Sequence, residues 1–364
     1  MTDQAATEVA TKTGRTRRPT RSRSGDPAID AEITALLDDA GAIADRDVLT
    51  DIFVSAVRLA GDRADRLDLK ITSAALKEME EAFRAFAPYK HVPKVTIFGS
   101  ARTLPHDPSY IQARTLAAEL ASRGWMVVTG AGPGIMAAGF EGAGRAMSFG
   151  VNIRLPQEQD ANPFILGDDK LVSMKYFFTR KLMLMKESLG FASLPGGFGT
   201  LDETLELLTL LQTGKAAPAP IVLVDHPGGQ MWHAFVDFAR GHLLPRGLID
   251  EFDFDLFTVT DDVEAACDEL IGFVRNYRSI RWVGKRLVVR MKEGPNDDEL
   301  AGLAAEFGSL ATDGKLKRTD PLAAEVKDND ALEDARIVLR YDGFQAGGLR
   351  RLINALNTLP SLAL

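Results

Sequence analysis

Six short apolar runs recur along the middle of the chain, and a helical pattern of apolar residues follows most of them. Most of the runs end in glycine or another turn-forming residue. The runs are KVTIFGS (94–100), WMVVTGAG (125–132), GVNIRLP (150–156), GFASLPGG (190–197), PIVLVD (220–225) and FTVT (257–260). Continuous apolar strands separated by helices are typical of a parallel sheet that is covered on both faces. The pattern predicts a doubly wound α/β domain over residues 91–278.

The two flanks of this domain have different patterns. In residues 28–90, apolar positions such as Ile33, Leu36 and Leu37 recur at helical spacing, which predicts a helical N-terminal segment. Its last helix is expected over residues 73–86, with Ser73 as the N-cap. Residues 279–364 indicate a strand, a helix, a strand pair and a final helix. This small α+β module has no catalytic pattern, and its position at the end of the chain suggests oligomerisation or regulation.

Composition narrows the classes of function. Residues 1–27 are small, polar and basic, which predicts a disordered tail because such a segment buries little apolar area. The net charge of −8 argues against a nucleic-acid partner for the rest of the chain. A single cysteine, Cys267, excludes an internal disulfide and suits a reducing compartment. Without a membrane span, a secretory signal or metal-ligand spacing among the five histidines, the sequence predicts a cytoplasmic protein that binds no metal.

Glycine-rich loops follow three of the predicted strands, at the edge of a parallel sheet where ligands bind. The loops hold Gly99 and Ser100, then the stretch TGAGPGIM (129–136), and then LPGGFGT (194–200). A helix N-terminus presents unpaired N–H groups, and glycine lets a phosphate approach them closely. Two stricter motifs are absent. Gly214-Lys215 precedes alanine, so there is no P-loop, and Ile135 occupies the position of the third glycine of a dinucleotide fingerprint.

Two motifs together resemble a known family. The stretch PGGFGTLDE (195–203) resembles the PGGxGTxxE signature of the LOG family, and TRKLM (179–183) resembles its second signature, an Arg-Lys pair on a helix. The resemblance covers residues 91–275. LOG proteins are phosphoribohydrolases that release the base from cytokinin riboside 5′-monophosphates, with a Rossmann-like fold and commonly as dimers.

The resemblance implies roles for individual residues. Arg180 and Glu203 would be the catalytic pair, and Lys181 would add charge near the phosphate. The expected substrate-binding residues are Gly99, Ser100, Gly132, Gly134, Met174, Lys181, Gly196, Gly197, Gly199 and Thr200. The expected partners are a nucleoside 5′-monophosphate and a second copy of the chain, with no cofactor. Because GAGPGIMAAG differs from the triple-glycine loop of the plant-type members, AMP is as well supported a substrate as a cytokinin nucleotide.

Other interpretations remain open from the sequence. TLDE (200–203) is also a capping box, with Thr200 as the N-cap and Glu203 reaching back to its N–H. A non-catalytic carrier of a nucleotide or of the molybdenum cofactor would use the same fold. A DNA-processing protein is the third alternative, which the basic tail favours and the acidic body opposes. No independent pattern supports a pyridoxal-phosphate site, although relatives have carried a lysine decarboxylase label.

Overall fold

The computed structural model describes residues 23–41, 44–61, 64–154 and 162–363. The chain divides into two compact units, Met1–Leu76 and Lys77–Leu364. Most of the predicted basic tail, residues 1–22, lies outside the described residues. No helix in the described part of the chain is long and apolar enough to cross a membrane.

The first unit is helical, as the apolar spacing predicts. It contains α1 (Pro27–Asp39), α2 (Arg46–Gly61) and the start of α3 (Arg66–Phe86). The Asp26 carboxylate caps α1 by accepting the N–H of Ala28, and α1 packs on α2 through Ile33 and Val54. The prediction that Ser73 is an N-cap is wrong. Helix α3 begins seven residues earlier because the Asp65 carboxylate accepts the first N–H groups of this helix.

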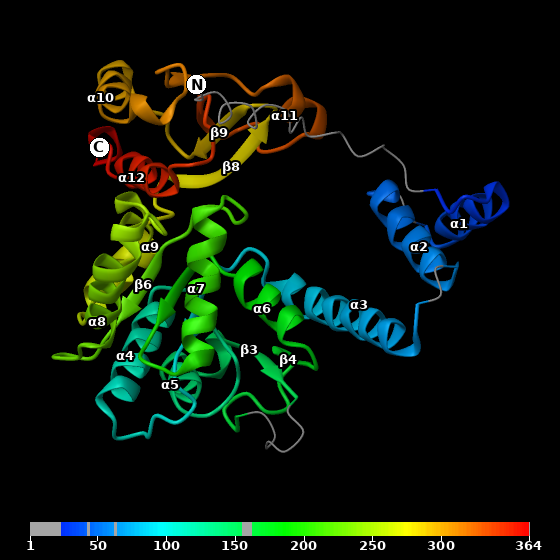
Figure 1. Cartoon of the computed structure of the whole chain (residues 1–364), viewed down its shortest axis with the longest axis horizontal. Coiled ribbons are helices and arrows are strands. Elements are labelled where there is room, and N and C mark those ends of the chain that lie inside the picture. Colours follow the sequence, from blue (N-terminus) through cyan, green and yellow to red (C-terminus); the bar gives the residue numbers. More distant parts are fainter. Residues whose placement is uncertain (1–22, 42–43, 62–63, 155–161, 364) are drawn as a thin grey trace, which may run out of the picture. The chain divides into compact units, whose positions relative to one another are not determined.

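The second unit is built on a sheet of seven parallel strands in the order β4-β3-β2-β1-β5-β6-β7 (Figure 1). The strands are β1 (Lys94–Phe98), β2 (Met126–Thr129), β3 (Ser148–Ile153), β4 (Leu171–Met174), β5 (Gly190–Ser193), β6 (Ile221–Val224) and β7 (Thr258–Thr260). The predicted doubly wound α/β fold is confirmed, and each of the six predicted strands is present. Strand β4 was missed because LVSM is short and lies at the edge of the sheet, where only Val172 and Met174 are buried.

Helices cover both faces of this sheet. One face carries α4 (Pro108–Ser122), α5 (Ile135–Ala143) and α9 (Val263–Gly272). The other face carries the end of α3, α6 (Phe177–Lys186), α7 (Phe198–Gln212), α8 (Met231–Phe238) and the short helix η5 (Glu251–Leu256). Neighbouring residues of one strand serve opposite faces, since Val222 packs under α9 whereas Leu223 belongs to the core beneath α7. Both faces are therefore closed to solvent, which explains the continuous apolar strands.

Strand β1 is flanked by β2 on one side and by β5 on the other, and the helices that follow β1 and β5, α4 and α7, cover opposite faces of the sheet. A crevice opens at such a switch point, outside the carboxyl ends of the strands. The loops that follow β1 and β5 meet there, because the Ser100 N–H donates to the Pro195 carbonyl at 3.2 Å. The topology thus places Gly99, Ser100 and the PGGFGT stretch at the usual ligand position of this fold.

A C-terminal module of four antiparallel strands, in the order β10-β11-β9-β8, completes the second unit (Figure 1). Its elements are β8 (Tyr277–Val283), β9 (Arg286–Met291), α10 (Asp297–Phe307), β10 (Lys317–Arg318), α11 (Ala323–Asp328), β11 (Ala335–Leu339) and α12 (Ala346–Asn357). The predicted small α+β module is confirmed, although the sequence analysis missed strand β8 and helix α11. Helix α12 fastens the module to the main domain, because the buried Arg350 guanidinium bonds the Asp255 carbonyl and the Glu269 carboxylate.

Glycine substitutions test this attachment. A Cβ on Gly347 in α12 would lie 1.8 Å from the Phe252 carbonyl oxygen, whereas a Cβ on the exposed Gly302 in α10 would meet nothing within 4 Å. We expect Gly347→Ala to lower the free energy of unfolding by about 1–3 kcal/mol through overpacking. The control Gly302→Ala should raise it by about 0.5–1 kcal/mol, since alanine favours the helix. Denaturant unfolding of both variants measures the difference, and equal behaviour would contradict the close approach.

Candidate functional site

A buried ion pair joins α6 to α7. Arg180 lies in the first turn of α6 and Glu203 in the second turn of α7, with 3.6 Å between Nη1 and Oε1. The two side chains are only 9% and 14% exposed. This separation is within ion-pair range but longer than a hydrogen bond. The carboxylate therefore keeps its lone pairs free for another donor.

Backbone carbonyls from two strand ends orient Arg180. Its Nε donates to the Val151 carbonyl in β3 at 3.0 Å, and Nη2 lies 3.4 Å from the Gly130 carbonyl after β2. A Cβ on Gly130 would lie 1.8 Å from Nη2, so this position accepts only glycine while the guanidinium stays in place. Burial lowers the pKa of Arg180, and the charge of Glu203 opposes that shift. The TGAG loop thus fixes the arginine rather than only providing a turn.

A residue that the sequence analysis missed holds the start of α6. The buried Glu78 carboxylate, from α3, accepts the Thr179 hydroxyl at 2.6 Å and the Lys175 N–H at 2.8 Å. Thr179 immediately precedes Arg180, so this contact sets the position of the arginine along the chain. Glu78 stands among other acids in KEMEE, and no local pattern distinguishes it from its neighbours.

Glu203 has unusual electrostatics for a carboxylate. Burial raises its pKa to about 7, and the positive charges of Arg180 and Lys181 limit the rise. A carboxyl group with a pKa near neutrality can take or release a proton at physiological pH, as general acid–base chemistry requires. The pair therefore combines a fixed cation with a group that titrates near neutral pH.

The start of α7 excludes the capping interpretation of TLDE. Helix α7 begins at Phe198, its N-cap is Gly197, and no side chain caps it. Thr200 is thus already the third helical residue, and Glu203 faces Arg180 instead of reaching back to an N-cap. The N–H groups of the first turn remain available to an anion. A Cβ on Gly197 or Gly199 would meet nothing within 4 Å, so space is open beside these N–H groups.

The other glycines bring the loops together. A Cβ on Gly196 would lie 2.2 Å from the Thr200 hydroxyl and 2.9 Å from the Ser100 nitrogen. Gly134 has φ +65°, and a Cβ there would lie 2.2 Å from the Ser100 carbonyl oxygen, which accepts the N–H at the start of α5. A Cβ on Gly99 would likewise clash with the Ile135 side chain. The structure therefore assembles Gly99, Ser100, Gly134, Gly196 and Thr200 around one point.

Three predicted residues have other surroundings. Lys181 forms ion pairs with Asp202 and Glu206, each at 2.6 Å. Burial alone would lower the pKa of Lys181, but its hydrogen bonds to these two carboxylates raise the pKa. Met174 is buried in the core at the end of β4. Gly132 neighbours the end of the Met136 side chain. Their predicted contacts with a substrate stay predictions. No group of three or more His, Cys, Asp or Glu residues in the described ranges is placed to hold a metal ion.

The raised pKa of Glu203 predicts a pH-dependent stability. Because this pKa rises from 4.5 to about 7 on folding, the folded protein binds the proton more tightly than the unfolded chain. The stability that Glu203 contributes is therefore full below pH 4.5 and is lost as the pH rises through about 7. As the pH rises from about 5 to about 8, we expect the Tm of Glu203→Gln to increase relative to that of the wild type.

Glu306→Gln is the control for this experiment, since Glu306 is an exposed carboxylate on α10 in the C-terminal module. Tm curves for Glu203→Gln and the wild type that stay parallel over the whole pH range would contradict the raised pKa.

Comparisons with known proteins gave one family match and several weak structural likenesses. Residues 134–270 match a family model described as "possible lysine decarboxylase". Among solved structures, a molybdenum cofactor binding protein from Rippkaea orientalis is 18% identical, with a TM-score of 0.35, and the match covers 50% of this chain and 96% of that one. The molybdenum cofactor carrier protein of Chlamydomonas reinhardtii is 20% identical, with a TM-score of 0.34 and coverages of 49% and 94%. No curated protein sequence matches.

At these identities and TM-scores the structural likenesses say nothing about what this chain binds. The assignment depends on the family match, on the two signatures that carry Arg180 and Glu203, and on the seven-stranded parallel sheet that places them together. The match spans residues 134–270 of the Rossmann-like domain, and the two signatures within it resemble those of the LOG family.

Proposed function

We propose that this protein hydrolyses the N-glycosidic bond of nucleoside 5′-monophosphates, releasing the free base and ribose 5-phosphate. One observation carries the proposal: the buried Arg180–Glu203 pair lies on the two helices α6 and α7, and α7 begins with an uncapped, glycine-lined N-terminus. An anion site and a titratable carboxylate on one helix suit a phosphorylated substrate whose bond breaks beside the carboxylate.

The chemistry needs few groups. Cleaving an N-glycosidic bond develops positive charge on the ribose, as in O-glycoside hydrolysis. Ionised Glu203 can stabilise that charge, anchor ribose hydroxyls or activate water, and Arg180 orients it. The first-turn N–H groups of α7 would hold the phosphate, and this remote binding energy positions the ribose. Gly197 and Gly199 leave the room that a phosphate needs.

The base remains open within the proposal. AMP and cytokinin riboside 5′-monophosphates share the phosphate and ribose that these residues would engage, and either fits the argument. A carrier that binds a nucleotide or the molybdenum cofactor without cleaving it is the alternative. Binding without release of base would favour the carrier, and we retain the enzyme because Arg180 and Glu203 are both present and paired.

The words "lysine decarboxylase" in the family description do not fit this site. A lysine that forms a Schiff base with pyridoxal phosphate needs a lowered pKa. Lys181, the lysine beside the proposed catalytic pair, has a raised pKa instead, because two carboxylates lie 2.6 Å from its ammonium group. We therefore assign no step to that cofactor.

We further propose that the chain forms a homodimer through α6 and α7. Phe178 and Leu182 on α6 and Phe198 and Leu205 on α7 are large apolar side chains exposed to solvent. A second copy would remove them from water, and a two-fold interface uses the same surface on both subunits. The proposed location is the cytoplasm, which the single cysteine suits.

The first functional prediction concerns the phosphate. We expect AMP to be cleaved and adenosine to react at least ~100-fold more slowly in kcat/KM, because each lost charge-assisted contact is worth roughly 1.5–3 kcal/mol. Gly197→Ala places a methyl group in the open space beside the N-terminus of α7, so it should raise KM for AMP at nearly unchanged Tm. Free base and ribose 5-phosphate are the products to measure. Equal rates on AMP and adenosine would refute the phosphate site.

The second functional prediction concerns Glu203. Glutamine keeps the shape of the side chain but cannot carry the negative charge, so Glu203→Gln should lower kcat by at least ~100-fold. The control Glu306→Gln, at an exposed carboxylate on α10 in the C-terminal module, should keep wild-type activity. Base release and Tm are measured on the same preparations. A stable Glu203→Gln variant with full activity would remove the main support for the enzyme.

A further inference from the structure

A cavity of about 770 Å³ lies at the opposite edge of the main sheet from the candidate site. Its lining includes Lys94, the first residue of β1, and Trp125 and Leu189, which immediately precede β2 and β5. The candidate site, in contrast, follows the carboxyl ends of these strands. The C-terminal module contributes Arg278 from β8 and Lys292, which follows β9. The pocket therefore lies where the module joins the Rossmann-like domain.

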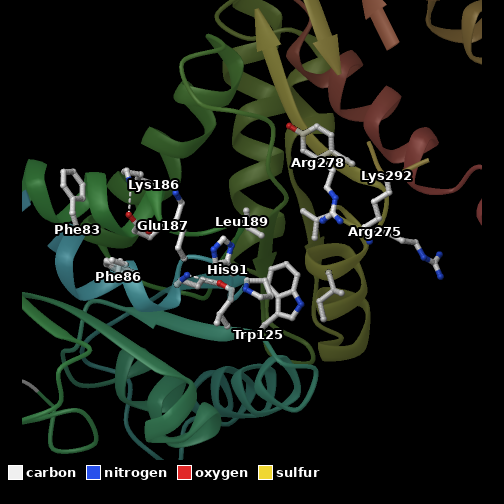
Figure 2. A pocket seen from close by; sticks show the side chains of 18 residues that line it. Phe83, Phe86, His91, Trp125, Lys186, Glu187, Leu189, Arg275, Arg278 and Lys292 are labelled. Atoms are coloured by element: carbon white, nitrogen blue, oxygen red, sulfur yellow. Dashed lines mark hydrogen bonds and ion pairs between the residues drawn. The ribbon is translucent and has the colours of Figure 1, made fainter. Parts of the chain in front are cut away.

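Positive charge dominates the wall of this pocket. Figure 2 shows Arg275, Arg278 and Lys292 gathered on one side and the paired Lys186 and Glu187 on the other. Arg275, Arg278 and Lys292 are exposed, and no carboxylate in the described part of the chain lies within ion-pair distance of them. In a chain with a net charge of −8, such a gathering of cations without salt bridges to the described residues is a local feature of this pocket, and Arg278 acts at longer range on a carboxylate, that of Asp334.

A further exposed lysine, Lys90, also lines the pocket without an ion-pair partner among the described residues. Lys94 is different, because its Nζ donates to the carbonyls of Tyr89 and Val92 and serves the local fold. Burial lowers the pKa of Lys94. The cations left for a ligand are thus those at the rim of the pocket.

Between the charged sides the lining is apolar and aromatic. Figure 2 shows Trp125, Leu189 and His91 between Lys186 and the arginines, with Phe83 and Phe86 beyond. Leu189 and Phe83 are both largely exposed although they are apolar. The Lys186 ammonium lies 5.0 Å from the centre of the Phe83 ring, a cation–π contact. Flat apolar surface next to several unpaired cations suits a ligand that carries both a ring and several negative charges.

We propose that this pocket binds a small polyanion that carries an aromatic ring, with the chemistry of a nucleoside di- or triphosphate. The volume lies in the range of roughly 300–1,000 Å³ that is usual for small-molecule sites. A nucleic acid would call for a basic stripe along a surface rather than a hollow. The cations left for a ligand come from two parts of the second unit, Lys90 before β1 and the segment from Arg275 to Lys292, so a bound polyanion would link the C-terminal module to the Rossmann-like domain.

Helix α6 connects this pocket to the candidate site. Arg180 lies near its start and Lys186 is its last residue, so both belong to one helix of ten residues, about 15 Å long. The Thr96 hydroxyl, from β1, bonds the Leu184 carbonyl at 2.7 Å and fixes the end of the helix to the sheet. An effect of the ligand on catalysis would follow from this connection, and that effect rests on the proposed function. Binding of the ligand to the pocket does not depend on the proposed function.

Calorimetric titration of the full chain with ATP, inorganic tripolyphosphate and adenosine tests the proposal. The test variant is Arg278→Gln/Lys292→Gln. The matched control is Lys285→Gln/Arg286→Gln, two exposed cations at the other end of the same β8–β9 hairpin that do not line the pocket. We expect ATP to bind the wild type and the control equally, and to bind the test variant at least ~10-fold more weakly, since two charge-assisted contacts are lost. Tripolyphosphate should bind more weakly than ATP, and adenosine weakest.

Several results would overturn the proposal. Unchanged ATP affinity in the test variant would place the binding elsewhere, for example at the N-terminus of α7. Equal losses in the test and control variants would indicate non-specific attraction. A DNA duplex that binds more tightly than ATP, and loses that binding in the test variant, would assign the pocket to nucleic acid. If the test variant fails to fold, as judged by Tm, the pair Lys90→Gln/Arg275→Gln replaces it with the same expected loss.

Discussion

The burial of the Arg180 guanidinium is the constraint on which the rest of the site depends. A charged group out of water must be compensated by partners, and here these are the Val151 and Gly130 carbonyls and the Glu203 carboxylate. Each partner comes from a different element, so β2, β3, α6 and α7 must all be in register before the arginine is satisfied. This requirement links the TGAG loop, which begins at Thr129, to helix α7, which follows the PGG stretch that begins at Pro195, although 66 residues separate the two starting points (195 − 129).

The same burial gives Glu203 its unusual pKa. A carboxylate on an exposed helix face would keep its ordinary pKa, whereas removal from water raises the pKa of Glu203 to about 7. Arg180 stabilises the ionised form without hydrogen-bonding it closely, at 3.6 Å. The stability of the ion pair and the protonation state of Glu203 therefore depend on one balance between desolvation and charge. Such a balance is typical of functional sites.

The second unit has two edges with different roles. The carboxyl edge of the sheet holds the glycine loops and the Arg180–Glu203 pair. The amino edge is where the C-terminal module attaches, through the buried Arg350 and the close approach of Gly347, and where the basic pocket opens. Helix α6 runs between these edges and carries Arg180 near one end and Lys186 at the other. Under the proposed function, a ligand at this pocket would influence the Arg180–Glu203 site through α6.

The sequence alone determined the doubly wound sheet and the glycine loops at its carboxyl edge, and its motifs singled out Arg180 and Glu203, because apolar runs and short motifs are local signals. Tertiary structure decided what local patterns leave ambiguous. It excluded the capping box of TLDE, since α7 begins at Phe198. It also revealed Glu78, which is distinctive only through its contact with Thr179, and the pocket cations, which are far apart in sequence. Burial, contact and charge density are properties of the folded chain, and for that reason no window of residues contains them.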